Sequence, residues 1–480
     1  MDQDAIIQSL ITSLPEITVL LAACLLLMLD LVWRRQRVAV IGYLAIAVIA
    51  IAALETLLIA GQTKPVYNGM FVLDDFAVFF KLLFCLITAL CILFSIGYLQ
   101  QEQIEHSEYY VLLLFALCGL MILASAVDLI IIYVGLELMA LSVYLLTGFK
   151  RQSPLSNEAA LKYVILSALS SSVLLYGMSL LYGLTGTTNI ADIAAVIGPQ
   201  AAIDPLLIFA IVFLIGGFSF KIAAVPFHMW VPDVYQGAPT SITAFMSVGP
   251  KAVGFAVLLR VFLQGLLPVS EIWLGLFTVI AVATMAVGSI VALVQHDIKR
   301  MLAYSSIAHV GFALLGVVAG GEAGIASVML YLLIYSFMNL GIFASIIVMC
   351  QGTFGGERIE DYTGLSRSHP VLAMLMLIYL FSLAGIPPTA GFFAKFYIFV
   401  ALIEQQHIAL AVIAVMFSAV AAFIYIRIVM LMYMRPPTGE FAIQLKLPPQ
   451  LALGITSVAV IVIGLFPSWF LTLAQIAILQ

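Results

Sequence analysis

The residues of this sequence most capable of chemistry are ionisable side chains placed inside long apolar segments. Lys221 follows an apolar run, and Lys251 lies near the midpoint of segment 240–263. Glu137 lies near the midpoint of segment 128–149. A charge at the centre of a membrane helix costs at least about 2.5–3.5 kcal/mol on insertion scales. Such residues usually face a polar interior and indicate a path for an ion or a substrate.

The chemistry that this set favours is proton transfer. We expect Glu137 and Lys221 to face each other, because opposite charges offset part of the cost of desolvation. Lys251 then has no acid of its own, and burial disfavours the charged form of an unpaired lysine. His309 adds an imidazole at mid-depth, and Lys395 adds a further amine. The alternative is a buried ion pair that only fixes helix packing.

The composition requires a membrane protein. The chain has 480 residues, of which 64% are hydrophobic and 9% are charged, and its mean hydropathy is +1.20. Soluble domains carry roughly 25% charged residues. We therefore predict an all-α polytopic membrane protein. The net charge of −5 comes with no basic patch, so we expect no nucleic-acid partner.

No cofactor site is expected in this chain. The cysteines lie in apolar runs without a CxxC pair, and the histidines are dispersed, so no iron–sulfur, zinc or haem ligand set has the usual spacing. Neither GxGxxG nor a P-loop pattern occurs, which excludes the common nucleotide sites. The five cysteines are Cys24, Cys85, Cys91, Cys118 and Cys350.

Fourteen segments are long and apolar enough to span a bilayer, which takes about 20 residues. Because residues 1–33 open with two acids rather than a basic region, we expect a retained first helix. Alternate loops hold eleven basic residues against Lys64 alone, which predicts that both termini face away from the cytoplasm. The predicted spans are 12–33, 38–60, 76–98, 108–126, 128–149, 158–183, 205–228, 240–263, 272–294, 299–319, 324–350, 371–404, 408–434 and 450–473. The eleven basic residues are Arg34, Arg35, Arg37, Lys150, Arg151, Lys299, Arg300, Arg358, Arg367, Arg435 and Lys446.

Other basic residues lie in or beside these segments. Lys81, Lys162 and Arg260 come within about five residues of a segment end, so their side chains could reach the membrane surface. Lys221 and Lys251 lie too deep for this.

Prolines interrupt two of the spans. The seventh contains Pro226, and the twelfth contains Pro387 and Pro388. Opened backbone at membrane depth is tolerated where it is buried or lines a wet cavity, and transporters place broken helices at matching positions of two repeats. The breaks lie in similar text, "FSFKIAAVPF" and "FSLAGIPPTAGF". The alternative is two unrelated proline kinks.

These breaks predict two five-helix repeats, helices 4–8 and 9–13, each with a broken fourth helix. Because five is odd, the second repeat inserts upside down relative to the first. The predicted divisions are an N-terminal three-helix segment (1–105), the first repeat (106–264), the second repeat (265–436) and a C-terminal helix (437–480).

Two long stretches carry a family resemblance. "PFHMWVPDVYQGAPTSITAFMSVGPKAVGFAVLLR", from Pro226 to Arg260, and "HDIKRMLAYSSIAHVGF", from His296, resemble the antiporter-like, proton-conducting membrane subunits. That family includes three large subunits of bacterial respiratory complex I, their organellar counterparts, and subunits of Mrp-type cation/proton antiporters. The fourteen-helix plan extends the resemblance over nearly the whole chain.

The resemblance implies roles for individual residues. The family's helix-five acid corresponds to Glu137, and its central lysines correspond to Lys221 and Lys251. Lys395 corresponds to the helix-twelve lysine, and His309 to a position near the central axis. The accessory residues of the proton access route are Lys162, which bridges Lys221 to Lys251 or to that route, and His228, Asp233 and Tyr304. The sequence departs from a symmetric pattern in having no acid near Ser305–His309 that would match Glu137.

The resemblance also implies a setting. The chain would be a subunit of an NADH:quinone oxidoreductase in a bacterial inner membrane, both termini being periplasmic. Its partners would be other membrane-arm subunits, the sister antiporter-like subunits among them, and membrane lipid. NADH, FMN, iron–sulfur clusters and quinone would bind in partner subunits, and quinone reduction there would drive protons outward. The alternatives are a subunit of an Mrp-type cation/proton antiporter and a scaffold with vestigial lysines.

Overall fold

The protein is a bundle of helices that run back and forth between two ends. The computed structural model describes residues 3–33, 38–61, 65–198, 204–350, 355–437 and 447–478, and in these ranges no β-strand forms beyond isolated bridges. Arg34, Arg35, Arg37, Lys64 and Lys446 lie outside the described residues. The α-helices are α1 (Gln3–Thr12), α2 (Leu14–Trp33), α3 (Val38–Leu58), α4 (Asp75–Gln101), α5 (Glu108–Ser125), α6 (Leu129–Thr147), α7 (Pro154–Thr185), α8 (Ile190–Ile197), α9 (Pro205–Ile222), α10 (Trp230–Gly237), α11 (Thr240–Arg260), α12 (Ser270–Ala292), α13 (Ile298–Ala319), α14 (Gly321–Met349), α15 (Leu365–Ser368), α16 (Pro370–Ala384), α17 (Ala390–Glu404), α18 (Ile408–Met434), α19 (Leu447–Leu465) and α20 (Pro467–Ile476).

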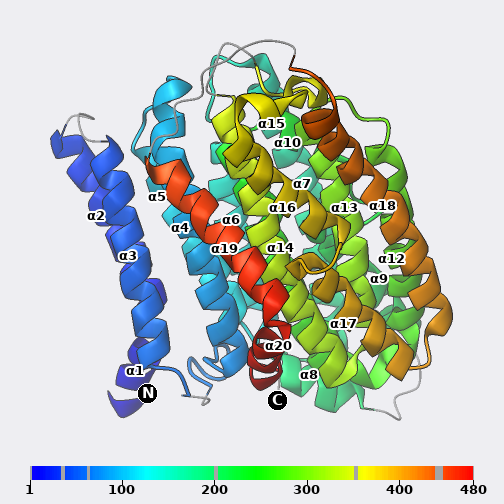
Figure 1. Cartoon of the computed structure of the whole chain (residues 1–480). Helices are drawn as coiled ribbons and strands as arrows, with labels where there is room; N and C mark the ends of the chain where they lie inside the picture. The colour runs from blue at the N-terminus through cyan, green and yellow to red at the C-terminus, as the bar shows by residue number, and fades with distance from the viewer. Residues whose placement is uncertain are drawn as a thin grey trace.

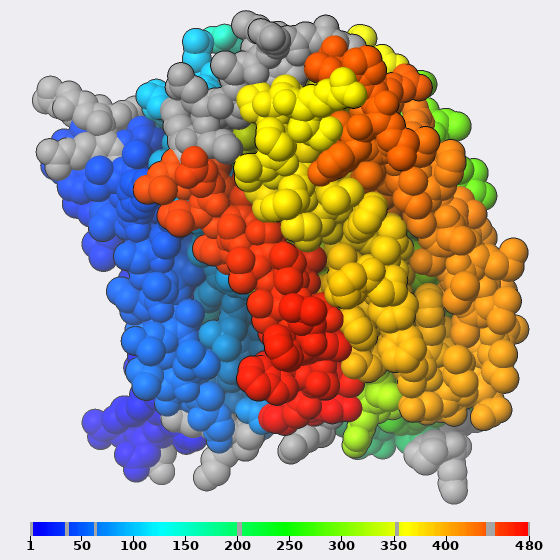
Figure 2. All heavy atoms as spheres, in the orientation of Figure 1, coloured from blue at the N-terminus to red at the C-terminus, as the bar shows by residue number. Residues whose placement is uncertain are grey.

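The predicted spans correspond to these helices. Thirteen helical segments in the described ranges are long and apolar enough to cross a membrane, and the interrupted pair α16 and α17 takes the place of the predicted twelfth span. The most buried spans are those of α11, α13 and α14. They form the centre of the bundle, while α19 and α20 cross one face between the N-terminal helices and α16–α18 (Figure 2). The prediction of an all-α polytopic membrane protein is confirmed.

The two ends of the bundle differ in charge. Both termini lie at one end (Figure 1), which we call the terminal end. The opposite end carries α10 and α15 (Figure 1) and is called the basic end. Its described basic residues are Lys150, Arg151, Lys299, Arg300, Arg358, Arg367 and Arg435.

The fourth helix of each predicted repeat is interrupted. The first break separates α9 from α10, and the second separates α16 from α17. Since α9 runs toward the basic end and α16 runs away from it (Figure 1), the two broken helices have opposite directions, as the inverted repeats require. The repeat boundaries themselves stay a prediction.

Both breaks end their first helix in the same way. Ala223 and Gly385 adopt left-handed backbone, with φ of 67° and 83°. In the first break the N–H of Ala224 donates to the carbonyl of Ser219. In the second the N–H of Ile386 donates to the carbonyl of Phe381. These are the bonds of a Schellman cap, which satisfies end carbonyls that have no partner inside the helix.

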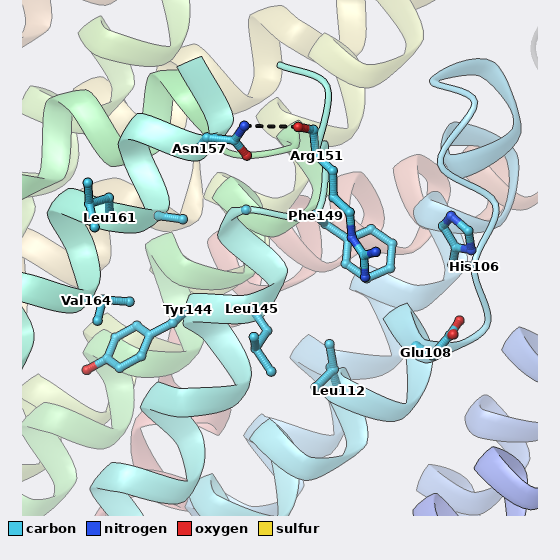
Figure 3. A pocket seen from close by; sticks show the side chains of 12 residues that line it. His106, Glu108, Leu112, Tyr144, Leu145, Phe149, Arg151, Asn157, Leu161 and Val164 are labelled. Carbon is cyan, nitrogen blue, oxygen red and sulfur yellow. Dashed lines mark hydrogen bonds between the residues drawn. The ribbon is translucent and has the colours of Figure 1, made fainter. Parts of the chain in front are cut away.

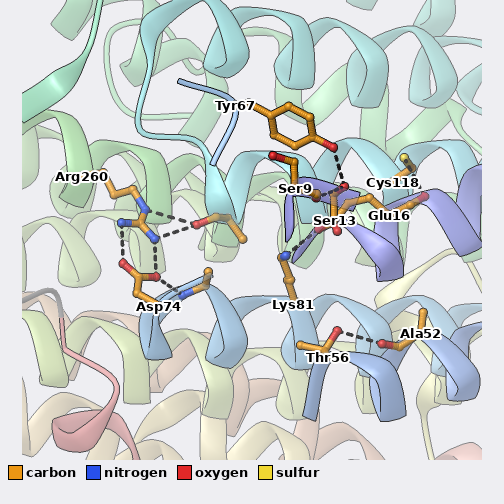
Figure 4. A network of polar contacts seen from close by, with 12 residues as sticks. Ser9, Ser13, Glu16, Ala52, Thr56, Tyr67, Asp74, Lys81, Cys118 and Arg260 are labelled. Carbon is orange, nitrogen blue, oxygen red and sulfur yellow. Dashed lines mark hydrogen bonds and ion pairs between the residues drawn. The ribbon is translucent and has the colours of Figure 1, made fainter. Parts of the chain in front are cut away.

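Lys81 and Arg260 do not reach the membrane surface, so that expectation is wrong. Lys81 is fully buried, and its Nζ lies 2.7 Å from the Glu16 carboxylate of α2 (Figure 4). Arg260 is buried and makes two bonds of 2.9 and 2.7 Å to Asp74. Acids distant in the sequence reach both cations, so each charge is neutralised inside the fold instead of in solvent. The two pairs tie α4 to α2 and to the end of α11.

Removing the Asp74 charge is expected to destabilise the protein. Asp74→Asn keeps an N-cap for α4, where the side chain accepts from Ala77 N–H, but leaves Arg260 buried without a counter-charge. Breaking a buried ion pair costs about 3–5 kcal/mol; since Asp74 is partly exposed and Arg260 keeps a bond to the Ala124 carbonyl, we expect roughly 2–3 kcal/mol. The measurement is thermal unfolding of the purified assembly. Asp75→Asn, at an exposed neighbour, is the control, and equal unfolding temperatures for the two variants would contradict this role.

Candidate functional site

Glu137 and Lys221 are joined through a serine instead of meeting directly. Ser171 on α7 donates to Glu137 Oε1 at 2.6 Å and accepts from Lys221 Nζ at 3.0 Å. Lys221 also donates to Ser167 at 3.1 Å. The expectation that Glu137 and Lys221 face each other as a direct pair is therefore corrected, because the hydroxyl of Ser171, on α7, separates the two charges. We call Glu137, Ser171, Lys221 and Ser167 the first cluster.

Lys251 lies at the centre of the bundle without an acid among the described residues. It is 2% exposed on α11, and its Nζ hydrogen-bonds the hydroxyl of Ser306 on α13. The ring of Tyr235 lies 5.5 Å from the same nitrogen. A neutral hydroxyl and an aromatic face stabilise an ammonium less than a carboxylate does. This amine is therefore better suited than a salt-bridged lysine to change its charge state.

His309 is held by two tyrosines. Its Nδ1 lies 2.6 Å from the hydroxyl of Tyr331, and its Nε2 lies 3.2 Å from the hydroxyl of Tyr425. Tyr425 also hydrogen-bonds Ser305, the residue before Ser306. A hydroxyl both donates and accepts, so His309, Tyr425 and Ser305 form a continuous hydrogen-bonded chain beside Lys251.

Lys395 lies across the second break. It follows the break on α17, and its Nζ donates to the carbonyls of Leu383 and Ala384 at 3.2 and 3.0 Å. These are the last residues of α16, where the helix dipole favours a cation. Ser418 accepts a third bond at 3.0 Å, and the ring of Phe312 lies 5.0 Å away. His309 contacts the same ring, so Lys395 and His309 are neighbours.

The five predicted relay residues thus fall into two groups. Glu137 and Lys221 belong to the first cluster, while Lys251, His309 and Lys395 lie near one another around α13. Among the described residues, no hydrogen bond connects the first cluster to Lys251. A proton passing between the groups would therefore need water or side-chain movement, and an open break beside Lys221 is where water is tolerated at this depth.

The accessory residues lie at or near the basic end. Lys162 is 42% exposed and donates to Asp233 at 2.8 Å, so it does not bridge Lys221 to Lys251. Asp233 on α10 also accepts from Arg300 on α13 at 2.7 Å. His228 lies in the connection between α9 and α10, and Tyr304 is half-buried on α13. Burial lowers the pKa of His228, although a hydrogen bond with the Pro226 backbone opposes this shift.

Asp233 ties α10 to α7 and α13 over a wide pH range. Burial raises the pKa of Asp233, but the bonds from Lys162 and Arg300 outweigh it, so the pKa lies below its ordinary value. A carboxyl group with a lowered pKa stabilises the folded state at pH values above its pKa in the unfolded chain, which is about 4. This stabilisation is lost only as the pH falls through the pKa of the group in the folded state. The anchor should therefore be constant between about pH 6 and 8.

Asp233→Asn is expected to loosen α10. Partly exposed ion pairs contribute about 0.2–1 kcal/mol each, so amide exchange in residues 230–237 should be roughly two- to tenfold faster. Hydrogen-exchange mass spectrometry at several pH values measures this. Glu158→Gln removes the second acid on Lys162 without touching α10 and is the control. Wild-type protection that changes between about pH 6 and 8 after correction for intrinsic rates would contradict the constant anchor.

The hydroxyl partners of the relay were missed by reasoning from the sequence. They come from α7, α13, α14 and α18, and only their density was a usable signal: "SALSSS" in α7 and "YSS" in α13 are unusually polar for buried spans. The missed residues are Ser167, Ser171, Ser305, Ser306, Tyr331, Ser418 and Tyr425.

Comparisons with known proteins show the family of this chain. Residues 126–421, more than half of the chain, match the family described as "NADH:quinone oxidoreductase/Mrp antiporter, TM". A protein of Rhizobium meliloti (strain 1021) named NADH-quinone oxidoreductase subunit N 2 is 59% identical over 98% of both chains. One of Acidithiobacillus ferrooxidans named NADH-quinone oxidoreductase subunit N is 44% identical over 95% of both.

Solved structures show the same fold. A chain of respiratory complex I from Thermus thermophilus is 31% identical, with a TM-score of 0.81 over 96% of this chain and 99% of that one. A chain of the Mrp complex from a Dietzia species superposes with a TM-score of 0.86 over 98% and 97%. Its 23% identity shows the fold alone.

This chain belongs to the membrane-spanning NADH:quinone oxidoreductase/Mrp antiporter family and, within it, to the subunit N group of NADH-quinone oxidoreductase. Its relatives are subunits of an enzyme complex. The absence of a cofactor from this chain stays a prediction.

Proposed function

We propose that this chain translocates protons as a membrane-arm subunit of NADH:quinone oxidoreductase. The observation that carries the proposal is the set of buried amines, at Lys221, Lys251 and Lys395, held mainly by hydroxyls and carbonyls. Groups held this way can change charge state inside a membrane, whereas a structural lysine would be locked to an acid, as Lys81 is to Glu16.

The basic end would face the cytoplasm. The positive-inside rule assigns that side to the loops rich in lysine and arginine, and both termini then lie on the periplasmic side. Protons would enter from the basic end toward Lys221, pass to Lys251, and leave by way of Lys395. Lys395 lies on α17, the half of the broken helix nearer the terminal end (Figure 1).

The driving force would be quinone reduction in partner subunits. When the Glu137 carboxylate moves away or loses its charge, the ammonium of Lys221 loses the negative charge that stabilises it across Ser171. Lys221 then releases its proton toward Lys251. The remaining half of each cycle would restore the proton on Lys221 from the cytoplasmic side. In each step one protonated group, an ammonium or the imidazolium of His309, loses a proton as the next basic nitrogen gains it.

Inverted membrane vesicles with and without the chain test this function. NADH oxidation should acidify vesicles that contain the chain, in sodium-free buffer, and removing the chain should abolish that acidification. If NADH oxidation and acidification persist without the chain while sodium/proton exchange is lost, the chain is a subunit of an Mrp-type antiporter and the proposal is wrong.

A further inference from the structure

A groove at the basic end lies apart from the relay. It has a volume of about 500 Å³ and runs between α5, α6 and α7 (Figure 3). Leu112, Leu145, Leu161 and Val164 form its apolar walls. Leu145 and Leu161 are 62% and 61% exposed, so the groove opens sideways, out of the bundle.

The rim of this groove carries a cation on a fixed support. The side chain of Arg151 extends from the α6–α7 connection beside the ring of Phe149 (Figure 3). Asn157 donates to the Arg151 carbonyl at 3.0 Å, and the rings of His106 and Tyr109 pack against Phe149. The neighbouring Lys150 is paired with Glu102. Arg151 forms no ion pair with any other described residue, so its guanidinium is available to an outside anion.

The depth of the groove corresponds to one leaflet. Val164 lies ten residues after Pro154, the first residue of α7, which is about 15 Å along a helix. The hydrocarbon core of a bilayer is about 30 Å thick. The groove therefore has a charge at the membrane surface and an apolar channel that extends below it to mid-membrane. A phospholipid has the same arrangement, with a charged headgroup above its acyl chains.

We infer that this groove binds one phospholipid of the leaflet at the basic end, with its phosphate on Arg151 and one acyl chain along the apolar walls. Arginine suits phosphate because its planar fork of N–H groups matches phosphate oxygens. Glu108 lies on the same rim, so the rim carries both signs. This favours a headgroup in which an ammonium accompanies the phosphate, as in phosphatidylethanolamine.

A second cavity, also lined by α6 and α7, lacks a cation and can be compared with the groove. It has a volume of about 470 Å³ at the terminal end of α6 and α7. Its lining contains Tyr133 and Tyr182 but no cation. Unlike this cavity, the first groove has a cation, Arg151, on its rim.

Photolabelling of the intact complex tests the lipid site. The complex would be reconstituted in vesicles of phosphatidylethanolamine and phosphatidylglycerol containing a trace of phosphatidylethanolamine with a photoactivatable acyl chain. Cross-links should fall on peptides that contain Leu112 and Leu161. Arg151→Gln should reduce them about tenfold because the charge-assisted contact is lost, and Leu161→Trp should reduce them by filling the groove.

The control variants are Arg367→Gln, at an exposed arginine of the same end, and Leu175→Trp, in the second cavity. Both should label like wild type. Equal labelling of wild type, Arg151→Gln and Leu161→Trp would overturn the site, as would cross-links that join these peptides to a neighbouring subunit instead of lipid. Equal labelling with a phosphatidylglycerol probe would overturn the choice of headgroup.

Discussion

Lys251→Ala is expected to lower NADH-driven proton translocation at least about tenfold, which corresponds to roughly 1.4 kcal/mol in the transfer barrier. Lys251 is the buried amine between the first cluster and the His309 chain, and its hydrogen bond to Ser306 places it against α13. Alanine keeps the helix but removes the only basic group in the described part of α11 before Arg260. The proton then has no carrier at the centre of the bundle.

Lys251→Arg should fail almost as completely. Arginine keeps the positive charge and the length, so a purely electrostatic or structural role would survive this change. A guanidinium is effectively never deprotonated in a protein, so it cannot pass a proton on. The arginine variant therefore separates a carrier from a fixed charge.

Both variants would be measured in inverted vesicles after a check for normal assembly, with quinone reduction and acidification recorded in one sample. Lys150→Ala, at the paired surface lysine of the basic end, is the control. Loss of both activities places Lys251 on a path tightly coupled to electron transfer. Loss of acidification alone shows that Lys251 lies on a proton path from which quinone reduction can be uncoupled. If neither changes, Lys251 is structural and the proposed route is wrong.

The spans and their breaks were predictable because their signals are local. Apolar length decides whether a segment can span a membrane, and proline removes a backbone donor wherever it occurs. Pro226, Pro387 and Pro388 therefore located both breaks before any tertiary information. Lys251 and Glu137 were identified for the same reason, since a charge in the middle of a spanning segment can be recognised from the sequence alone.

The partners of these charges were not predictable, because they depend on which helices pack together. Ser171 lies 34 residues from Glu137 and 50 from Lys221, and no spacing rule selects it from the other serines of α7. Lys81 and Arg260 were misjudged for a related reason. Because both residues lie close to a segment end, their side chains were expected to reach solvent. Instead they pair with Glu16 and Asp74, which come from other parts of the fold.

Glu137→Gln is the second prediction with a large expected effect. Glu137 is the acid of the first cluster, and its charge acts on Lys221 across one hydroxyl. At such separations, an effective dielectric constant of about 20 gives roughly 3 kcal/mol between unit charges, or about a hundredfold in equilibrium. Glutamine keeps the hydrogen bond to Ser171 but not the charge. We expect NADH-driven acidification to fall by at least about tenfold, measured in inverted vesicles.

Ser171→Ala distinguishes the charge of Glu137 from the bridge that transmits it. The variant keeps both ionisable groups and the bond from Lys221 to Ser167 but removes the only hydroxyl between them. Hydrogen bonds to charged groups contribute about 1.5–3 kcal/mol, part of which water can replace in an opened break, so acidification should fall about three- to tenfold. Glu158→Gln, which removes an exposed acid of the same helix, should have little effect.

Normal pumping in Ser171→Ala, together with failed pumping in Glu137→Gln, would show that the carboxylate acts on Lys221 without the serine. Normal pumping in Glu137→Gln would remove the acid from the mechanism, because a polar side chain of the same size would then be sufficient.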